Sequence, residues 1–173
     1  MYERQLTRID LVRKQLDEML KQCEDKETSR NGYVHLYGVG QACALIALHR
    51  GYDRKYAELA EIAGMLHDYS TYKDGIREHH AEKSSVEAEQ ILKSLNQFTS
   101  EEIAMVCQAI RRHSDKEQVH TEFDEILKDA DDMQHWLRNP VEEYFFQKER
   151  AQKLAKEFGL IKEQGENDNE HRV

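Results

Sequence analysis

The segment AEIAGMLHDYSTYK, residues 60–73, carries an apolar helical stripe directly into a histidine–aspartate pair. Ala60 and Ala63 precede His67 by seven and four residues, so the three side chains share one face of a helix. Asp68 follows at once. A lone histidine on an apolar face is more often a satisfied core residue than a ligand, so the meaning of the pair depends on what the other helices carry.

Apolar residues spaced three or four apart recur on both sides of this segment and predict an all-α fold, a single bundle of about six to seven helices. The expected helices are 3–24, 33–50, one capped by Asp53 that ends near His67, one from His80 through Leu95, one that starts at Thr99 and carries Ile110, one from Phe123 through Leu137, and 140–158, opened by Pro140. Between them we expect a turn at Asn31–Gly32 and loops over 69–78 and 113–120. We expect one domain over 1–160 and a polar, disordered tail over 161–173.

The composition excludes several classes of protein. The chain has 173 residues, which suits one domain, and its 25 Lys and Arg against 34 Asp and Glu give a net charge of −9, which disfavours nucleic acid as a partner. The longest apolar run, Ala42–Leu48, is far shorter than the ~20 residues that span a bilayer. The first ten residues lack the apolar core of a signal peptide, and the three cysteines are widely spaced. We therefore expect a cytoplasmic protein, not bound to a membrane, with buried, reduced thiols.

Four of the nine histidines and two aspartates interrupt the apolar stripes of five helices, where they point toward the expected core: His35, His67, Asp68, His80, His113 and Asp131. Buried carboxylates cost several kcal/mol unless they are paired or bound to metal. Imidazole and carboxylate together suit Fe, Mn, Co or Zn better than Ca²⁺. Because six ligands exceed the three protein ligands of a typical catalytic zinc, the set favours two ions that share a bridging carboxylate.

The order His35 … His67-Asp68 … Asp131 resembles the H…HD…D signature of the HD-domain superfamily of metal-dependent phosphohydrolases. The flanking segments are similar as well, in order and at plausible spacing: VHLYGVGQACALIAL (34–48), AEIAGMLHDYSTYK (60–73), HHAEKSSVEAEQIL (79–92), IRRHSDK (110–116) and EILKDADDM (125–133). The resemblance covers residues 30–137, the HD core of the domain. It is specific because five separated segments match, whereas an HD doublet alone is a weak signal.

The resemblance implies which residues bind metal. His35, His67, Asp68 and Asp131 fill the four signature positions, and His80 and His113 match the additional histidines of the two-metal branch, with Asp68 as the bridge. The cofactor would be one or two divalent ions of Fe, Mn, Co, Mg or Zn. His79 is a rival of His80, and Asp129 and Asp132 are rivals of Asp131 that we expect to lie behind the ligands or in solvent. His135 follows Asp131 by four residues, and we expect it at the surface, with a position behind the ligands as the alternative.

The resemblance also implies hydrolysis of a phosphate ester or anhydride by a metal-activated water, an activity of enzyme class EC 3.1. Asp68 or Asp131 would orient the water, and Lys73 is the first candidate for a catalytic cation, because a Lys or Arg shortly after the HD pair is common in the family. Positive groups that could bind the substrate phosphate are Lys73, Arg77, Arg111 and Arg112. The expected partner is a nucleotide or a related small phosphorylated metabolite.

Two other functions remain open at this point. Some members of the fold are two-iron oxygenases with the same ligand set, and a metal-binding or ligand-sensing module without activity is the non-enzymatic alternative. The complete set of six ligands argues against the second, because degenerate modules usually lose ligands. The sequence leaves a homo-oligomer undecided.

Overall fold

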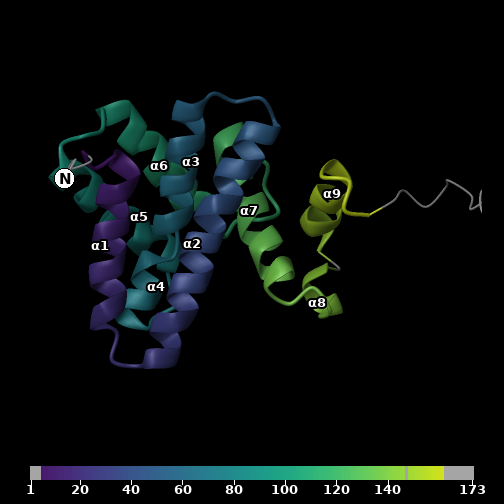
Figure 1. Cartoon of the computed structure of the whole chain (residues 1–173), viewed down its shortest axis with the longest axis horizontal. Helices are drawn as coiled ribbons and strands as arrows, with labels where there is room; N and C mark the ends of the chain where they lie inside the picture. Colours follow the sequence, from purple (N-terminus) through teal and green to yellow (C-terminus); the bar gives the residue numbers. More distant parts are fainter. Residues whose placement is uncertain (1–4, 147, 162–173) are drawn as a thin grey trace, which may run out of the picture.

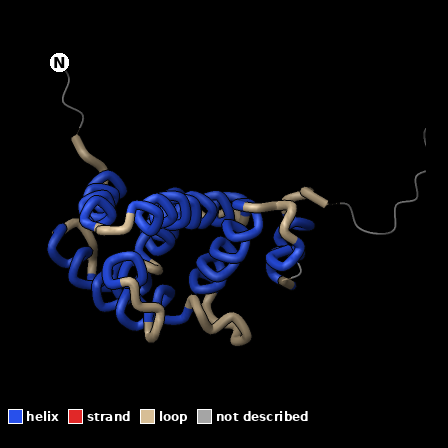
Figure 2. Tube along the Cα trace, turned by 90° about the horizontal axis from the view of Figure 1, so that it is seen from below, coloured by secondary structure: helices blue, strands red, loops and turns tan. Residues whose placement is uncertain are grey.

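Nine helices and no strand make up the part of the chain that this computed structural model describes, residues 5–146 and 148–161 (Figures 1 and 2). The all-α prediction is confirmed. The helices are α1 (Arg8–Gln22), α2 (Lys26–His49), α3 (Arg54–Leu66), α4 (Tyr69–Asp74), α5 (His80–Leu95), α6 (Ser100–Arg112), α7 (Glu122–Arg138), α8 (Glu143–Phe146) and α9 (Glu149–Glu157).

Side-chain caps set the beginnings of most long helices. Thr7, Thr99 and Thr121 each form a capping box with an acidic residue three positions later, at the starts of α1, α6 and α7. Asp25 and Asp53 accept hydrogen bonds from first-turn amides of α2 and α3. The starts predicted from Asp53 and Thr99 are confirmed.

The α2 helix is the centre of the bundle. It packs most extensively against α3 and α7, and α1 lies along its other side (Figure 1). Its fully buried stripe continues the apolar core of the other helices: Leu36, Val39, Cys43, Ile46 and Ala47. At 24 residues it is the longest helix, yet neither it nor any other helix of the described residues is long and apolar enough to cross a membrane.

Close backbone contact joins α2 to α3. A Cβ on Gly64 would lie 2.7 Å from the Cα of Gly40 and 2.8 Å from its backbone nitrogen, so only glycine allows this approach. Gly64 lies three residues before His67, and Gly40 lies five residues after His35. The contact therefore sets the distance between these two histidines.

The prediction that helix 33–50 follows a turn at Asn31–Gly32 is wrong, because α2 begins at Lys26 and runs through both residues. Gly32 serves close packing instead of a turn. A Cβ there would lie 2.9 Å from Cδ1 of Tyr72 and closer still to Cδ2 of Leu20. A glycine that admits a neighbouring side chain and one that forms a turn look the same in a sequence.

The prediction of a ten-residue loop over 69–78 is also wrong in part. Residues 69–74 form α4, which ends at Gly75 in the left-handed conformation, φ 70°. Ser70 explains the added turn, because its backbone amide donates to Oγ of Ser84 and its hydroxyl approaches the His80 carbonyl. The residues after Asp68 are thereby packed against α5.

The C-terminal helix predicted over 140–158 is two separate helices. Pro140 lies before α8 and opens neither of them, and Tyr144 of α8 is 67% exposed. The α9 helix packs through Ala151, Leu154 and Ala155. The N-terminal helix begins at Arg8 instead of residue 3, and residues 162–173 of the expected polar tail lie outside the described part of the chain.

Replacing Gly64 by alanine should destabilise the fold. Overpacking against the Gly40 backbone lowers the free energy of unfolding by about 1–3 kcal/mol. The better helix propensity of alanine offsets only ~1 kcal/mol of this loss. Urea unfolding followed by circular dichroism measures the difference. Gln90→Ala, at an exposed position of α5, is the control and should change the free energy of unfolding by less than about 0.5 kcal/mol. A Gly64→Ala protein as stable as the unaltered chain would contradict the close packing.

Candidate metal centre

Five helices bring the six predicted ligands to one place. The residues come from the middle of α2, the end of α3, the start of α5, the end of α6 and the third turn of α7: His35, His67, Asp68, His80, His113 and Asp131. His35, His67, His113 and Asp131 are buried, and His80 and the Asp68 side chain are partly exposed. These six residues, called the cluster below, form two groups that share Asp68.

In the first group, Nε2 of His35 and Nε2 of His67 are 3.2 Å apart. Oδ1 of Asp131 lies 3.5 Å from the former and 3.7 Å from the latter. In the second group, Nε2 of His80 and Nε2 of His113 are 3.3 Å apart, and Oδ1 of Asp68 lies 3.4 Å from each. The two groups have the same arrangement: two imidazole nitrogens and one carboxylate oxygen.

The other ring nitrogen of each histidine determines its tautomer. Nδ1 of His67, His80 and His113 donates to the backbone carbonyl three residues earlier, at 2.7, 2.9 and 2.7 Å. A carbonyl oxygen only accepts, so each Nδ1 carries a proton, and each ring in its neutral form presents an Nε2 lone pair. These three rings are therefore oriented for a ligand at Nε2.

His35 is oriented by a side chain instead of the backbone. Its Nδ1 lies 2.7 Å from Oε1 of Gln134, and the Gln134 amide nitrogen donates to the Val34 carbonyl, which places the amide oxygen toward the ring. His35 therefore also presents an Nε2 lone pair. Gln134 was not predicted from the sequence, although it lies three residues after Asp131 and so near it on α7.

If both rings of a pair are neutral in this tautomer, their lone pairs face each other at 3.2 and 3.3 Å and repel unless a proton or a metal cation lies between them. Two nitrogen ligands of one ion, each about 2.1 Å from it, are roughly 3.0–3.4 Å apart at octahedral to tetrahedral angles. Both nitrogen pairs have this separation. Oδ1 of Asp68 and Oδ1 of Asp131 are buried and have no hydrogen-bond donor. The residues present therefore fit one divalent ion in each group.

Asp68 lies between the two groups. Its Oδ1 is near His80 and His113, while its Oδ2 lies 3.8 Å from Nε2 of His35 and 3.7 Å from Nε2 of His67. Each oxygen of one carboxylate thus faces a different pair of histidines. This is the arrangement of a bridging ligand.

Burial and charge shift the pKa values of the cluster in different directions: burial opposes the charged form of His67, but Asp68 and Asp131 outweigh it and raise the pKa of that ring. Burial, with the neighbouring charge of His67, lowers the pKa of His35 to about 4. Burial opposes the charged form of Asp68 and of Asp131, but His67 and His113 lower the pKa of Asp68, and Lys116, His135 and His67 lower that of Asp131. His35 is therefore neutral and both carboxylates are ionised, the forms that coordinate metal.

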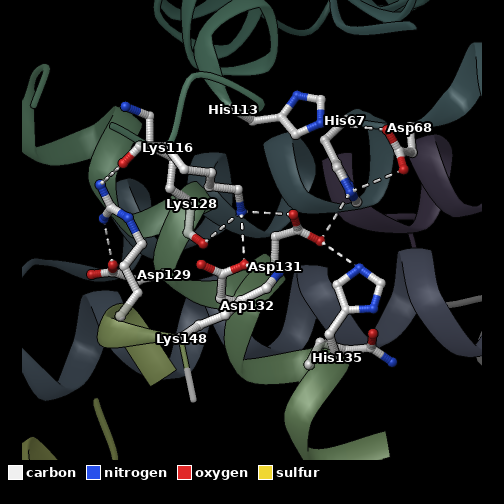
Figure 3. A network of polar contacts seen from close by, with 12 residues as sticks. His67, Asp68, His113, Lys116, Lys128, Asp129, Asp131, Asp132, His135 and Lys148 are labelled. Atoms are coloured by element: carbon white, nitrogen blue, oxygen red, sulfur yellow. Dashed lines mark hydrogen bonds and ion pairs between the residues drawn. The ribbon is translucent and has the colours of Figure 1, made fainter. Parts of the chain in front are cut away.

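The rivals of the predicted ligands lie elsewhere. His79 has a 72% exposed side chain next to Glu78, whereas His80 faces Asp68. Asp129 pairs with Arg50 and Arg150, at 2.8 Å each. Asp132 pairs with Lys116 and Lys148 (Figure 3). Asp129 and Asp132 thus belong to ion pairs on α7 beside the cluster and do not enter either group.

His135 contacts the cluster although its side chain is 33% exposed, so it holds the position behind the ligands that was the alternative to the surface. Its Nε2 lies 3.4 Å from Oδ1 of Asp131, and its ring centroid is 4.8 Å from that of His35 (Figure 3). The available signal was its spacing, four residues after Asp131 and so one helical turn away. Lys116, which donates to Asp131, gave no such signal because it lies in a loop.

A cavity of about 380 Å³ opens onto the cluster. Its wall includes His35, Asp68, His80 and His135, and the remainder is made of Thr28, Asn31, Thr71, Tyr72, Gly75, Arg77 and Arg138. Of the four cations predicted to bind phosphate, the structure places Arg77 here. Arg138, not predicted, donates to Oδ1 of Asn31 at 2.6 Å.

The other three predicted phosphate ligands do not line this cavity. Lys73 turns toward α5 and pairs with Glu87 at 2.6 Å, because residues 69–74 are helical instead of extended. Arg112 pairs with Asp124 at 3.0 Å. Arg111 lines a separate groove between α5 and α6. Proximity in sequence to His67 or to His113 does not bring these side chains to the cluster.

Comparison with known proteins gives one match. The family model described as HD domain matches residues 32–136, a range that contains all six predicted ligands. No curated protein and no solved structure matches the chain.

Metal titration should count two sites. Isothermal titration of metal-free protein with Mn²⁺ or Zn²⁺ is expected to give two ions per chain. His80→Ala should leave one, because it removes a ligand of the second group only. His79→Ala, the adjacent exposed histidine, should leave two. A stoichiometry of zero in the unaltered protein would rule out the metal centre.

Proposed function

The chain belongs to the HD domain family, and from this premise we propose that it is a metal-dependent phosphohydrolase that cleaves a phosphate ester or anhydride of a nucleotide or a related small phosphorylated metabolite. The observation that carries the proposal is the doubled arrangement of the cluster. Two pairs of histidine Nε2 atoms face the two oxygens of Asp68, beside a cavity whose wall includes two arginines.

Different residues of the chain would have different roles in such a reaction. His35, His67 and Asp131 would hold one ion, His80 and His113 the other, and Asp68 both. Bound divalent ions supply Lewis acidity, which activates water near neutral pH and draws in phosphoryl oxygens. Asp68 and Asp131, ionised at neutral pH, are acceptors that can orient the attacking water.

The part of the cavity wall that lies outside the cluster would bind the substrate. Arg77 and Arg138 are the two cations of its wall, and a guanidinium can donate two parallel hydrogen bonds to one phosphate. Thr71 contributes a buried hydroxyl without a hydrogen-bond partner. The pair of arginines favours an anionic substrate although the chain carries a net charge of −9.

Asp68→Ala should abolish hydrolysis and leave a folded helical protein, because it removes the shared ligand of both groups. The assay is release of inorganic phosphate from a panel of nucleotides and sugar phosphates, with Mn²⁺, Co²⁺, Fe²⁺ or Zn²⁺ added to metal-free protein. Asp74→Ala, an exposed aspartate of α4, is the matched control and should retain full activity. Metal-loaded protein that hydrolyses none of the panel would favour the oxygenase or the ligand-sensing alternative.

Arg138→Met should raise KM by roughly 10–100-fold, the value of one lost charge-assisted hydrogen bond of about 1.5–3 kcal/mol. Arg111→Met should leave KM within about twofold, because Arg111 lies on the groove between α5 and α6. Steady-state kinetics on whichever substrate the panel identifies measures both. Equal effects of the two substitutions would contradict the assignment of the cavity as the substrate site.

A further inference from the structure

Lys116 is the cation closest to the cluster that the proposed reaction does not use. It lies in the loop between α6 and α7, three residues after His113. Its Nζ donates to Oδ2 of Asp131 at 2.8 Å, to Oδ1 of Asp132 at 3.3 Å and to the Lys128 carbonyl at 3.1 Å. An ammonium has three N–H donors, and all three have an acceptor here, so the position of the charge is fixed.

The two oxygens of Asp131 have different environments. Oδ2 is bound by Lys116, whereas Oδ1 faces His35, His67 and His135 and has no hydrogen-bond donor. Figure 3 shows Asp131 between Lys116 on one side and His67 and His135 on the other. The lysine therefore decides which oxygen is available to a ligand in the cluster.

We propose that Lys116 is a positioning residue that holds Oδ2 of Asp131, presents Oδ1 alone to the metal, and by its charge weakens the binding of the cation. The proposal rests on the proposed metal-dependent function. A carboxylate shared with an ammonium donates less charge to a metal, so the ion keeps more of its own charge for the substrate phosphate.

Two effects of removing Lys116 oppose each other. Release of Asp131 from its hydrogen bond weakens metal binding, but loss of a positive charge beside the site strengthens it. The aspartate side chain has only two torsions and its backbone is held within α7, so the cost of release is small. The repulsion between an ammonium and a divalent ion a few ångströms apart in a buried site is larger. The charge effect therefore decides the sign.

Lys116→Met is expected to bind Mn²⁺ about tenfold more tightly than the unaltered protein, or tighter still. The measurement is competition with a chelating dye, using metal-free protein. The absorption spectrum of the Co²⁺-loaded protein should also change, because Asp131 becomes free to coordinate through both oxygens. Lys116→Arg, which keeps the charge, should have the affinity and spectrum of the unaltered protein.

Lys128→Met is the matched control. Lys128 is another lysine beside the cluster, with a fully buried side chain, and its Nζ contacts Gln118, His120 and Glu125 but none of the six ligands. Its removal should alter stability without altering Mn²⁺ affinity. Should Lys116→Met fail to fold, Lys116→Gln removes the charge and keeps a donor, and the same tighter binding is expected of it.

Unchanged or weaker Mn²⁺ binding by a folded, charge-removing variant would overturn the proposal, as would an equal effect of Lys128→Met. A structural role alone predicts weaker binding together with lower stability. In the phosphate-release assay, Lys116→Met should be slower in spite of its tighter metal. If no protein in the series hydrolyses any substrate, the proposed function fails, whereas the affinity shift still tests the role of Lys116.

Discussion

Facing lone pairs are the constraint on which this structure depends. Four imidazoles turn their Nε2 atoms toward one another in two pairs, and Asp68 lies between the pairs with one oxygen facing each pair. Such an arrangement is unfavourable in a protein interior unless a cation enters it. The fold must therefore hold the rings against their own repulsion, which requires rigid elements on every side.

Helix ends provide much of that rigidity. His67 and His113 occupy the C-caps of α3 and α6, and His80 begins α5. Carbonyls near a helix C-terminus lack the usual partner four residues on, so those at Gly64 and Ile110 can accept from Nδ1, although Ile110 also accepts from the His113 amide. The same polar groups that a helix end leaves unsatisfied thus select the tautomer that metal binding needs. His35, in the middle of α2, has no such carbonyl and uses Gln134 instead.

Charges beside the cluster form a chain that reaches from α9 to the ligands. Lys148 pairs with Asp132, Asp132 with Lys116, and Lys116 with Asp131 (Figure 3). Alternation of sign allows four charged groups to share a partly buried region. It also means that the electrostatic environment of Asp131 is set by residues that never touch the ion.

The sequence by itself determined the helical class, the caps at Asp53 and Thr99, and the six residues of the cluster, because apolar spacing records which face of a helix is buried and the resemblance to the HD family selects among the polar residues on that face. The tertiary structure alone decided that Gly32 allows close packing and that residues 69–74 are helical. It also decided which polar side chains lie at the cluster or its cavity: His135, Gln134, Lys116 and Arg138. The side chains that point elsewhere are those of Lys73, Arg111 and Arg112. The physical reason is that long polar side chains take their direction from partners distant in the chain, such as Glu87 for Lys73 or Asp131 for Lys116. Periodicity along one helix carries no information about such partners.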